Sequence, residues 1–387
     1  MLRRLHRTAR LRVLEPLTYG AARARAGVRY KVSGGPAPRS FLLVTDNGNV
    51  TSEQQWAPLR RWRSKFRQEL GLVFRWMDLA VAQQLSSAAL SRWSVVGLKL
   101  SWQKTRVEAV AATRSLRERL DGTTTRLVYF DGDDDLCVQW PEVLKLCDLY
   151  VKKQVFADPS GYLVTYTGKC NLTDYVARTF GESFADNHIP ASGLLQLPDL
   201  GKLFLDWNLA LGDTIVDMDQ RLRRAVPLAK DVDIVCRAAI PQSWLRHLRQ
   251  GVLGHLQTLA RTYRVIAPDR AVTKSEYEAE MRRSRICVSP FGYGELCWRD
   301  FEAILCGCLL VKPDMSHVRT RPDLFEAGVT YVPVRWDYSD LAEVCARYLA
   351  DENARRAIAD RALVRLRAQL EPGWCVGVYR ELMDRLA

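Results

Sequence analysis

The sequence lacks a long apolar run and any cysteine or histidine spacing typical of a metal or redox site. Its ten cysteines include no CxxC pair, and its five histidines are scattered. A membrane-spanning helix needs about 18–20 consecutive apolar residues, and a zinc site needs closely spaced Cys and His. We therefore expect neither. Cys236, Cys287, Cys306 and Cys308 lie in apolar runs, which favours reduced, buried thiols in a cytosolic protein.

The first fourteen residues lack the apolar core of about 7–15 residues that a secretory signal needs. Five arginines lie among leucines and valine there. The segment has three interpretations: a solvated basic arm, a helix on a membrane surface, or a transit peptide. We assign residues 1–39 to a basic N-terminal arm.

The composition excludes a disordered chain and suits two domains. Of the 387 residues, 48% are apolar and 26% charged, as in an average soluble protein. The length fits two domains of about 150–200 residues each. The net charge is +13, yet residues 1–126 carry +16 and the remainder −3. This asymmetry indicates an anionic partner, either nucleic acid or an acidic membrane surface.

Short apolar runs alternate with helical stretches along the chain. We expect strands at 41–48 (ending in a turn), 72–78, 94–102, 126–135 and 148–156, and a helix over 51–70. A second series begins at the strand 231–237, after a helical stretch at 203–225. This rhythm predicts α/β architecture, with two doubly wound Rossmann-like domains facing a cleft. We expect an N-terminal α/β domain at 40–228, a C-terminal α/β domain at 229–370, and a helix at 371–387 that packs back on the first.

The segment 289–313 carries the strongest chemical signal. A strand runs into a loop with Gly292 and Gly294, and we expect a helix from about Glu295. Small residues and free N–H groups at a helix start favour phosphate. On that helix Glu295, Arg299 and Glu302 would share one face. They would line a cleft that binds pyrophosphate and ribose, or form only an ion-pair ladder.

Phe-Gly-Tyr-Gly-Glu followed by Arg-Asp-Phe-Glu-Ala-Ile-Leu-Cys-Gly-Cys resembles the donor-binding signature of GT-B glycosyltransferases. The exostosin-like and CgeB-like C-terminal domains are the most similar, over about 231–365. The resemblance implies that Glu302 binds the donor ribose and that Arg299 and the 292–295 turn face the diphosphate or sugar. It implies no cofactor beyond the nucleotide-sugar and no divalent metal. The implied donor-binding residues are Arg237, Gly292, Tyr293, Gly294, Arg299, Glu302 and Lys312.

One departure leaves the stereochemistry open. Retaining members of the common GT-B families carry two glutamates separated by seven residues. Glu302 matches the second, but Gly294 stands where the first is expected and Glu295 comes one residue late. Glu295 is nevertheless a catalytic candidate.

A second acidic cluster, Asp131–Asp135, directly follows the apolar strand segment RLVYF at 126–130. It has three interpretations: a carboxylate metal site, a general base for an acceptor hydroxyl, or a polar loop that caps the next helix. The absence of metal in most GT-B enzymes argues against the first. Asp131 and Asp133 are the catalytic candidates. Asp46 and Asn47 are candidate acceptor-side residues, while His188 and His317 are candidates that could equally be structural.

The basic stretch 59–67 interleaves Trp62 and Phe66 with five cationic residues. It fits nucleic-acid binding, contact with anionic lipid headgroups, or a solvated helix face with its aromatics in the core.

Together with the charge distribution, the resemblance implies a cytoplasmic glycosyltransferase, peripheral on the inner membrane face. It would move a sugar from a nucleotide-sugar to a hydroxyl of a cell-surface glycan or glycolipid, such as lipopolysaccharide or capsule. The basic N-terminal third would contact an anionic membrane, and no nucleic-acid partner is expected. The alternatives are a nucleotide-sugar epimerase of the same fold and a nucleic-acid-binding protein that uses the basic third.

Overall fold

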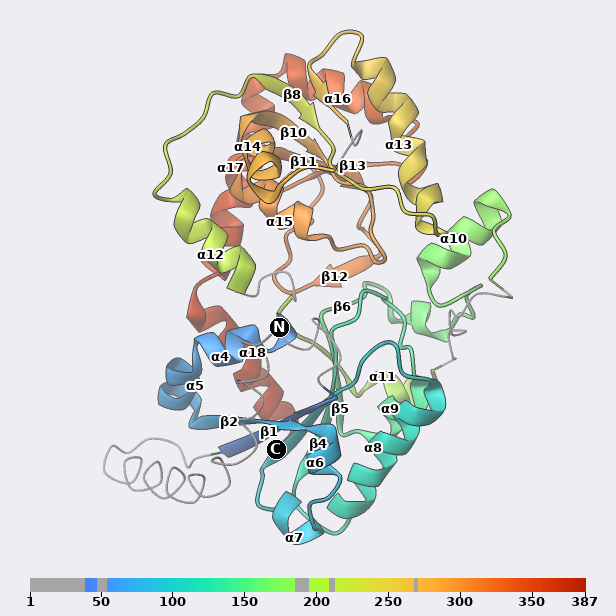
Figure 1. Ribbon diagram of the computed structural model, residues 1–387, viewed down its shortest axis with the longest axis vertical. Helices are drawn as coiled ribbons and strands as arrows, with labels where there is room; N and C mark the ends of the chain where they lie inside the picture. Colours follow the sequence, from blue (N-terminus) through green and yellow to red (C-terminus); the bar gives the residue numbers. More distant parts are fainter. Residues whose placement is uncertain (1–38, 47–53, 185–194, 209–212, 268–270) are drawn as a thin grey trace.

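The computed structural model describes residues 39–46, 54–184, 195–208, 213–267 and 271–387. They form two parallel β-sheets, one in the lower and one in the upper part of Figure 1, with a two-stranded sheet between them. The predicted class, α/β with two doubly wound Rossmann-like domains, is confirmed. The predictions about the N-terminal arm, Asn47 and His188 concern residues outside those described.

The N-terminal sheet has six strands in the order β2-β1-β3-β4-β5-β7. Every neighbouring pair is parallel. Strands β1, β3 and β4 are buried along nearly their whole length, as expected for a parallel sheet covered on both faces. The strands are β1 (Arg39–Thr45), β2 (Leu72–Asp78), β3 (Val95–Lys99), β4 (Arg126–Asp131), β5 (Leu149–Lys152) and β7 (Leu203–Leu205).

Local sequence signals account for the ends of the helices around this sheet. Thr105 and Glu108 form a reciprocal capping box at the start of α8. Gly71 adopts a left-handed conformation that ends α5 and turns the chain into β2. The helices are α4 (Ala57–Arg61), α5 (Arg63–Leu70), α6 (Leu79–Ala82), α7 (Ser87–Leu90), α8 (Arg106–Leu120), α9 (Pro141–Leu146), the 3₁₀ helix η1 (Pro159–Leu163), α10 (Asn171–Phe180) and α11 (Leu197–Leu200).

The C-terminal sheet has five strands in the order β13-β11-β10-β8-β9, again all parallel. Its strands are β8 (Val232–Val235), β9 (Val265–Ile266), β10 (Ser284–Val288), β11 (Leu309–Pro313) and β13 (Val332–Val334). The helices in this part of the chain are α12 (Asp213–Leu222), α13 (Leu245–Leu259), α14 (Lys274–Arg283), α15 (Trp298–Leu305), α16 (Leu341–Ala350) and α17 (Glu352–Gln369), followed by the last helix, α18 (Pro372–Arg385).

Each sheet contains a point where the strand order reverses. It lies between β1 and β3 in the first sheet and between β8 and β10 in the second. In open α/β sheets, ligands bind beyond the carboxyl ends of the strands at this reversal, because the flanking loops run to opposite faces and leave a crevice. The topology therefore predicts a ligand site at the loops after β8 and β10.

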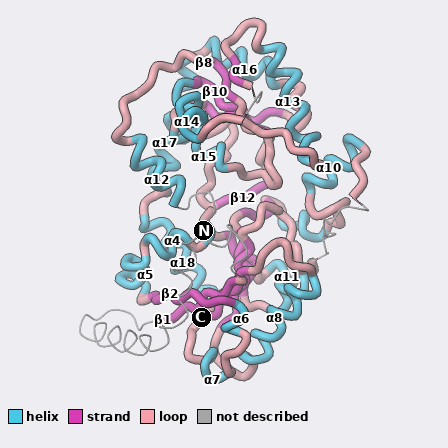
Figure 2. Tube along the Cα trace, viewed as in Figure 1, coloured by secondary structure: helices cyan, strands magenta, loops and turns pink. Residues whose placement is uncertain are grey.

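A small antiparallel sheet joins the two halves. Strand β6 (Gln154–Phe156) follows β5 of the first sheet, and β12 (Val318–Thr320) follows β11 of the second. Figure 2 shows this pair of strands between the two larger sheets. A ladder with one strand from each half ties the halves by backbone hydrogen bonds, which do not depend on side-chain identity.

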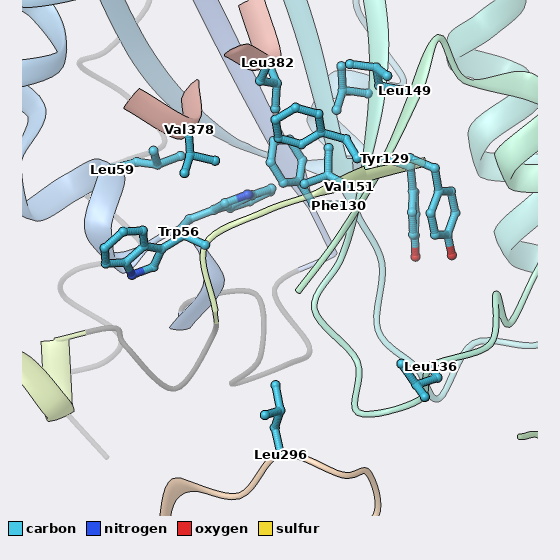
Figure 3. Packing of buried hydrophobic residues seen from close by; sticks show 14 of the residues in the cluster. Trp56, Leu59, Tyr129, Phe130, Leu136, Leu149, Val151, Leu296, Val378 and Leu382 are labelled. Carbon is cyan, nitrogen blue, oxygen red and sulfur yellow. The ribbon is translucent and has the colours of Figure 1, made fainter. Parts of the chain in front are cut away.

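The chain returns to the first half at its C-terminal end. In α18, Tyr379 packs edge-on against Phe66 of α5, with ring centroids 5.3 Å apart. Figure 3 shows Val378 and Leu382 of the same helix among core residues of the N-terminal half, which include Phe130. The C-terminal helix therefore completes the N-terminal core.

Two predicted helices differ from the structure, and one strand was not predicted. The helix predicted over 51–70 is interrupted at Trp62, which packs against Trp207 with ring centroids 6.3 Å apart. The stretch predicted as helix over 203–225 begins with strand β7, because Leu203–Leu205 pairs with β5; its helix is confined to α12. Strand β12 was not predicted, since three residues without alternation give no signal outside the β6 ladder.

Candidate functional site

The loop after β10 leads into α15 at the reversal point of the C-terminal sheet. We predicted a helix from about Glu295, but α15 begins at Trp298. Cys297 is extended at the N-cap, and the Asp300 carboxylate accepts its backbone N–H at 3.0 Å. Glu295 therefore lies in the loop, and the predicted three-residue stripe reduces to Arg299 and Glu302.

The Arg299 side chain holds this loop in place by hydrogen bonds. Its side chain donates to the Ser289 hydroxyl at 3.0 Å and to the Pro290 carbonyl at 2.6 Å. A longer bond of 3.4 Å reaches the Arg237 carbonyl beyond β8. The residue is only 8% exposed. Arg299 thus positions the ends of both strands that flank the reversal point.

Lys312, at the end of β11, is wholly buried. Its ammonium lies 2.7 Å from an Asp300 carboxylate oxygen and 2.7 Å from the Glu295 carbonyl oxygen. Asp300 also accepts a hydrogen bond from the Ser289 hydroxyl. Lys312 is therefore the buried ion-pair partner of Asp300. It also contacts the backbone of the loop 289–297, which contains Gly292 and Gly294 and is called the glycine loop below.

Arg237 and Glu302 each have a partner on α14. The Arg237 guanidinium forms two bonds of 2.7 Å with Glu280. The Tyr277 hydroxyl donates to Glu302 at 2.7 Å, while burial, followed by the charge of Glu302, raises the pKa of Tyr277. Glu302 is half-buried, and Tyr293 in the loop is 47% exposed.

The acidic cluster is held by a matching set of lysines. Four aspartates each lie within 3 Å of a different ammonium group. The Lys152 ammonium also donates to two carbonyl groups of the 135–137 backbone, at 3.0 and 3.1 Å. The loop is therefore locally neutral and fastened to β3 and β5. The pairs are Asp131–Lys152 at 2.7 Å, Asp133–Lys99 at 2.9 Å, Asp134–Lys153 at 2.6 Å and Asp135–Lys169 at 2.9 Å.

Burial and charge act differently on the two catalytic candidates of this cluster. Burial opposes ionisation of Asp131, but the Lys152 and Lys99 ammoniums outweigh it and lower its pKa. Burial raises the pKa of Asp133, and the neighbouring Asp131 charge adds to this despite Lys99. Asp131 is therefore the carboxylate that stays ionised, and Asp133 is the better proton acceptor of the pair.

The two loops singled out from the sequence meet in the structure. Gly294 lies against the backbone of Asp134, so close that a Cβ there would be 2.7 Å from the Asp134 carbonyl carbon. The Gln154 side chain donates to the Asp134 carbonyl oxygen at 2.5 Å. The loop that contains Gly294 and the loop that contains Asp134 are therefore in direct contact, although they lie 160 residues apart in the sequence.

Glu295 lies at the centre of this junction and is 1% exposed. Its carboxylate accepts from Asn171 at 2.8 Å and lies 3.2 Å from the His317 ring nitrogen. The Gln154 amide donates to it at 3.4 Å. Gln154 and Asn171 belong to the N-terminal half, and no motif or spacing identified them. The structure places His317, a candidate from sequence, beside Glu295.

Sequence reasoning missed Asp206, which directly follows β7, much as Asp131 ends β4. It is 1% exposed and accepts the Trp207 N–H at 2.7 Å. Burial raises its pKa to about 7, even though this bond and the charge of Arg321 oppose the shift. Its signal was an aspartate after an apolar run, hidden because the run was interpreted as helix.

Three further features concern the cysteines, metal-binding clusters and membrane-spanning helices. All ten cysteines are among the described residues; all are free, and eight are buried. Within the described ranges, no three His, Cys, Asp or Glu residues are arranged to hold a metal ion. In the same ranges no helix is both long and apolar enough to cross a membrane.

Residues 227–374 match the model of a family described as glycosyl transferase-like. The matched segment contains the whole C-terminal sheet, the glycine loop and α15. This segment is thus glycosyl transferase-like in sequence, as the resemblance implied. No curated protein sequence matches the chain.

Several solved structures are similar over most of their length. An alpha-glucosyltransferase in complex with UDP-glucose and DNA shares 11% identity, with a TM-score of 0.44 and 90% and 99% of the two chains covered. Anabaena HepE in complex with UDP-glucose also shares 11% identity, with a TM-score of 0.45, and the match covers 89% of this chain and 99% of that chain. A Listeria monocytogenes protein described as a UDP-N-acetylglucosamine 2-epimerase shares 10% identity, with a TM-score of 0.43, and the match covers 87% of this chain and 97% of that chain. Since these TM-scores are below 0.5, the fold assignment rests on the sheet topology.

Proposed function

We propose that the protein is a GT-B glycosyltransferase that moves a sugar from a nucleotide-sugar to a hydroxyl of a cell-surface glycan acceptor. One observation carries the proposal. The glycosyl transferase-like segment places its glycine loop and the start of α15 at the reversal point of the C-terminal sheet, where open α/β sheets bind ligands.

On the donor side, Glu302 accepts hydrogen bonds from the ribose, and the loop around Gly292, Tyr293 and Gly294 contacts the diphosphate or sugar. Arg299 and Lys312 are buried under the loop, so they act through it: they hold backbone N–H groups in place and add positive charge behind the diphosphate. Arg237 contributes in the same way from the end of β8.

On the acceptor side, the cluster after β4 provides the proton acceptor. Asp133 is the base, and Asp131 remains ionised beside it. Glu295 joins the two halves and sets the distance between donor and acceptor. Since each aspartate already has an ammonium partner, catalysis proceeds without a divalent metal, through positioning and stabilisation of the leaving diphosphate.

The acceptor is a glycolipid or a growing surface polysaccharide at the cytoplasmic face of the membrane. The support is the charge of +16 in residues 1–126, which favours an acidic surface.

The test is a thermal-shift screen of the full chain with UDP, GDP, CMP and dTDP and their common sugars. One nucleotide should raise Tm, and Glu302→Gln should weaken its binding by about ten- to hundredfold, because a hydrogen bond to a charged acceptor is worth about 1.5–3 kcal/mol. Glu352→Gln, a change of the same kind on α17, is the matched control. No Tm shift with any nucleotide, or an unchanged affinity in Glu302→Gln, would contradict the donor site.

Turnover separates the alternatives. A transferase releases nucleoside diphosphate only when an acceptor is present, whereas an epimerase converts the donor alone. A nucleic-acid-binding protein would bind oligonucleotides without any affinity for nucleotide-sugars.

A further inference from the structure

A hollow of about 480 Å³ lies at the outer edge of the N-terminal sheet, between α5 and β2. In Figure 1 these elements lie at the left side of the lower half. Strand β2 ends the sheet order, so among the described strands nothing pairs with its outer edge. The volume falls in the range of ordinary small-ligand sites. We call this feature the β2-edge hollow.

The polar lining of the β2-edge hollow consists of hydrogen-bond donors. Arg63, Ser64 and Arg67 come from α5, and Arg75 and Trp76 come from β2. The other lining residues are apolar, and no carboxylate is among them. Three guanidinium groups without an acidic lining residue favour a group that only accepts hydrogen bonds and is anionic.

The indole of Trp76 adds a second observation. Its N–H is buried and has no hydrogen-bond partner among the described residues. Arg60 lies over the same ring, 5.3 Å from its centroid, as a cation–π contact. Trp76 thus adds an aromatic ring beside the guanidinium groups of the β2-edge hollow.

Two charged residues next to the β2-edge hollow, Arg61 and Glu69, have ion-pair partners outside its lining. Arg61 lies 3.0 Å from Asp213 and 2.8 Å from Asp217 on α12, so it joins two helices. Glu69, the only carboxylate of α5, lies near Lys65 and Arg380, at 3.5 and 3.8 Å. Arg63 and Arg67 are one helical turn apart on α5 and are therefore neighbours on its surface.

We propose that the β2-edge hollow binds the phosphate of an acidic membrane lipid and so seats the N-terminal half on the membrane. This inference rests on the proposed function only for the location of the acceptor. Arginine favours phosphate because its planar group bonds two oxygens at once. An indole beside arginines is typical of proteins at a bilayer surface.

The test is sedimentation of the full chain with vesicles of phosphatidylcholine alone or mixed with phosphatidylglycerol. Wild type should bind only the mixed vesicles, and Arg63→Ala/Arg67→Ala should lower its partition coefficient by about tenfold or more, because each basic residue near such a surface contributes about 1 kcal/mol. The control Arg261→Ala/Arg356→Ala removes two exposed arginines from the other half and should have little effect. Tm of each variant checks folding.

Each other outcome overturns the proposal. Equal losses in the two double variants would mean diffuse charge attraction. Binding that depends on Arg63 and Arg67 but is seen only with glycerol phosphate or an oligonucleotide would assign the hollow to a soluble phosphate or to nucleic acid. Nucleotide-sugar affinity of Arg63→Ala/Arg67→Ala, measured in parallel, keeps failure here distinct from failure of the donor site.

Discussion

Gly294 of the C-terminal half lies against the backbone of Asp134 in the N-terminal half, with no room for a side chain between them. The contact joins the loop that precedes α15 to the acidic loop that follows β4. Any residue other than glycine would push these loops apart, and the two halves of the candidate site would separate. The position therefore needs glycine for close approach rather than for its backbone angles.

Gly294→Ala tests this contact directly. A Cβ would lie 2.7 Å from the Asp134 carbonyl carbon and 3.0 Å from its Cβ, so we expect a loss of about 1–3 kcal/mol of unfolding free energy and weaker donor binding. Gly377→Ala is the matched control, because a Cβ there meets nothing within 4 Å and alanine favours the α18 helix. Urea unfolding of both variants measures the effect; similar stabilities would contradict the tight contact.

Lys312→Met distinguishes a structural lysine from one that contacts phosphate. Removal of the ammonium leaves the buried Asp300 carboxyl group without its ion-pair partner, so we expect a loss of about 3–5 kcal/mol of unfolding free energy. Adding Asp300→Asn should restore part of that loss. If Lys312→Met instead lowered only nucleotide affinity and left urea unfolding unchanged, Lys312 would be a direct phosphate ligand.

Asp206 should make the stability of the protein depend on pH. Burial raises its pKa to about 7, whereas an aspartate in an unfolded chain has a pKa of about 3.9. The folded state therefore binds the proton more tightly, and the stabilisation present below about pH 4 is lost as the pH rises to about 7.

Asp206→Asn cannot ionise, so its unfolding free energy relative to wild type should increase between about pH 4 and pH 7, by up to about 4 kcal/mol, and then level off. Urea unfolding at several pH values measures this difference, with the exposed Asp360→Asn as the control for loss of one carboxylate. A difference that is independent of pH would show that Asp206 has an ordinary pKa.

The sequence predicted the parts of the fold that local patterning determines. The buried runs of β1, β3, β4, β10 and β11 could be identified because helices cover both faces of each sheet. Gly292, Gly294 and Glu302 could be identified because they form a known signature. Asp206 and β12 could not, since their environment depends on the pairing of β7 with β5 and of β12 with β6.

The sequence alone determined the two α/β units, the glycosyl transferase-like character of the second and the location of the excess charge in the first third. Only the tertiary structure decided what the charged side chains do. It placed Lys152, Lys312 and Arg299 in the interior, because a buried charge requires a partner of the opposite sign or hydrogen bonds to the backbone. It also brought Gly294 to Asp134 and Glu295 to Asn171. These contacts depend on how the two sheets face each other, which no local pattern of residues records.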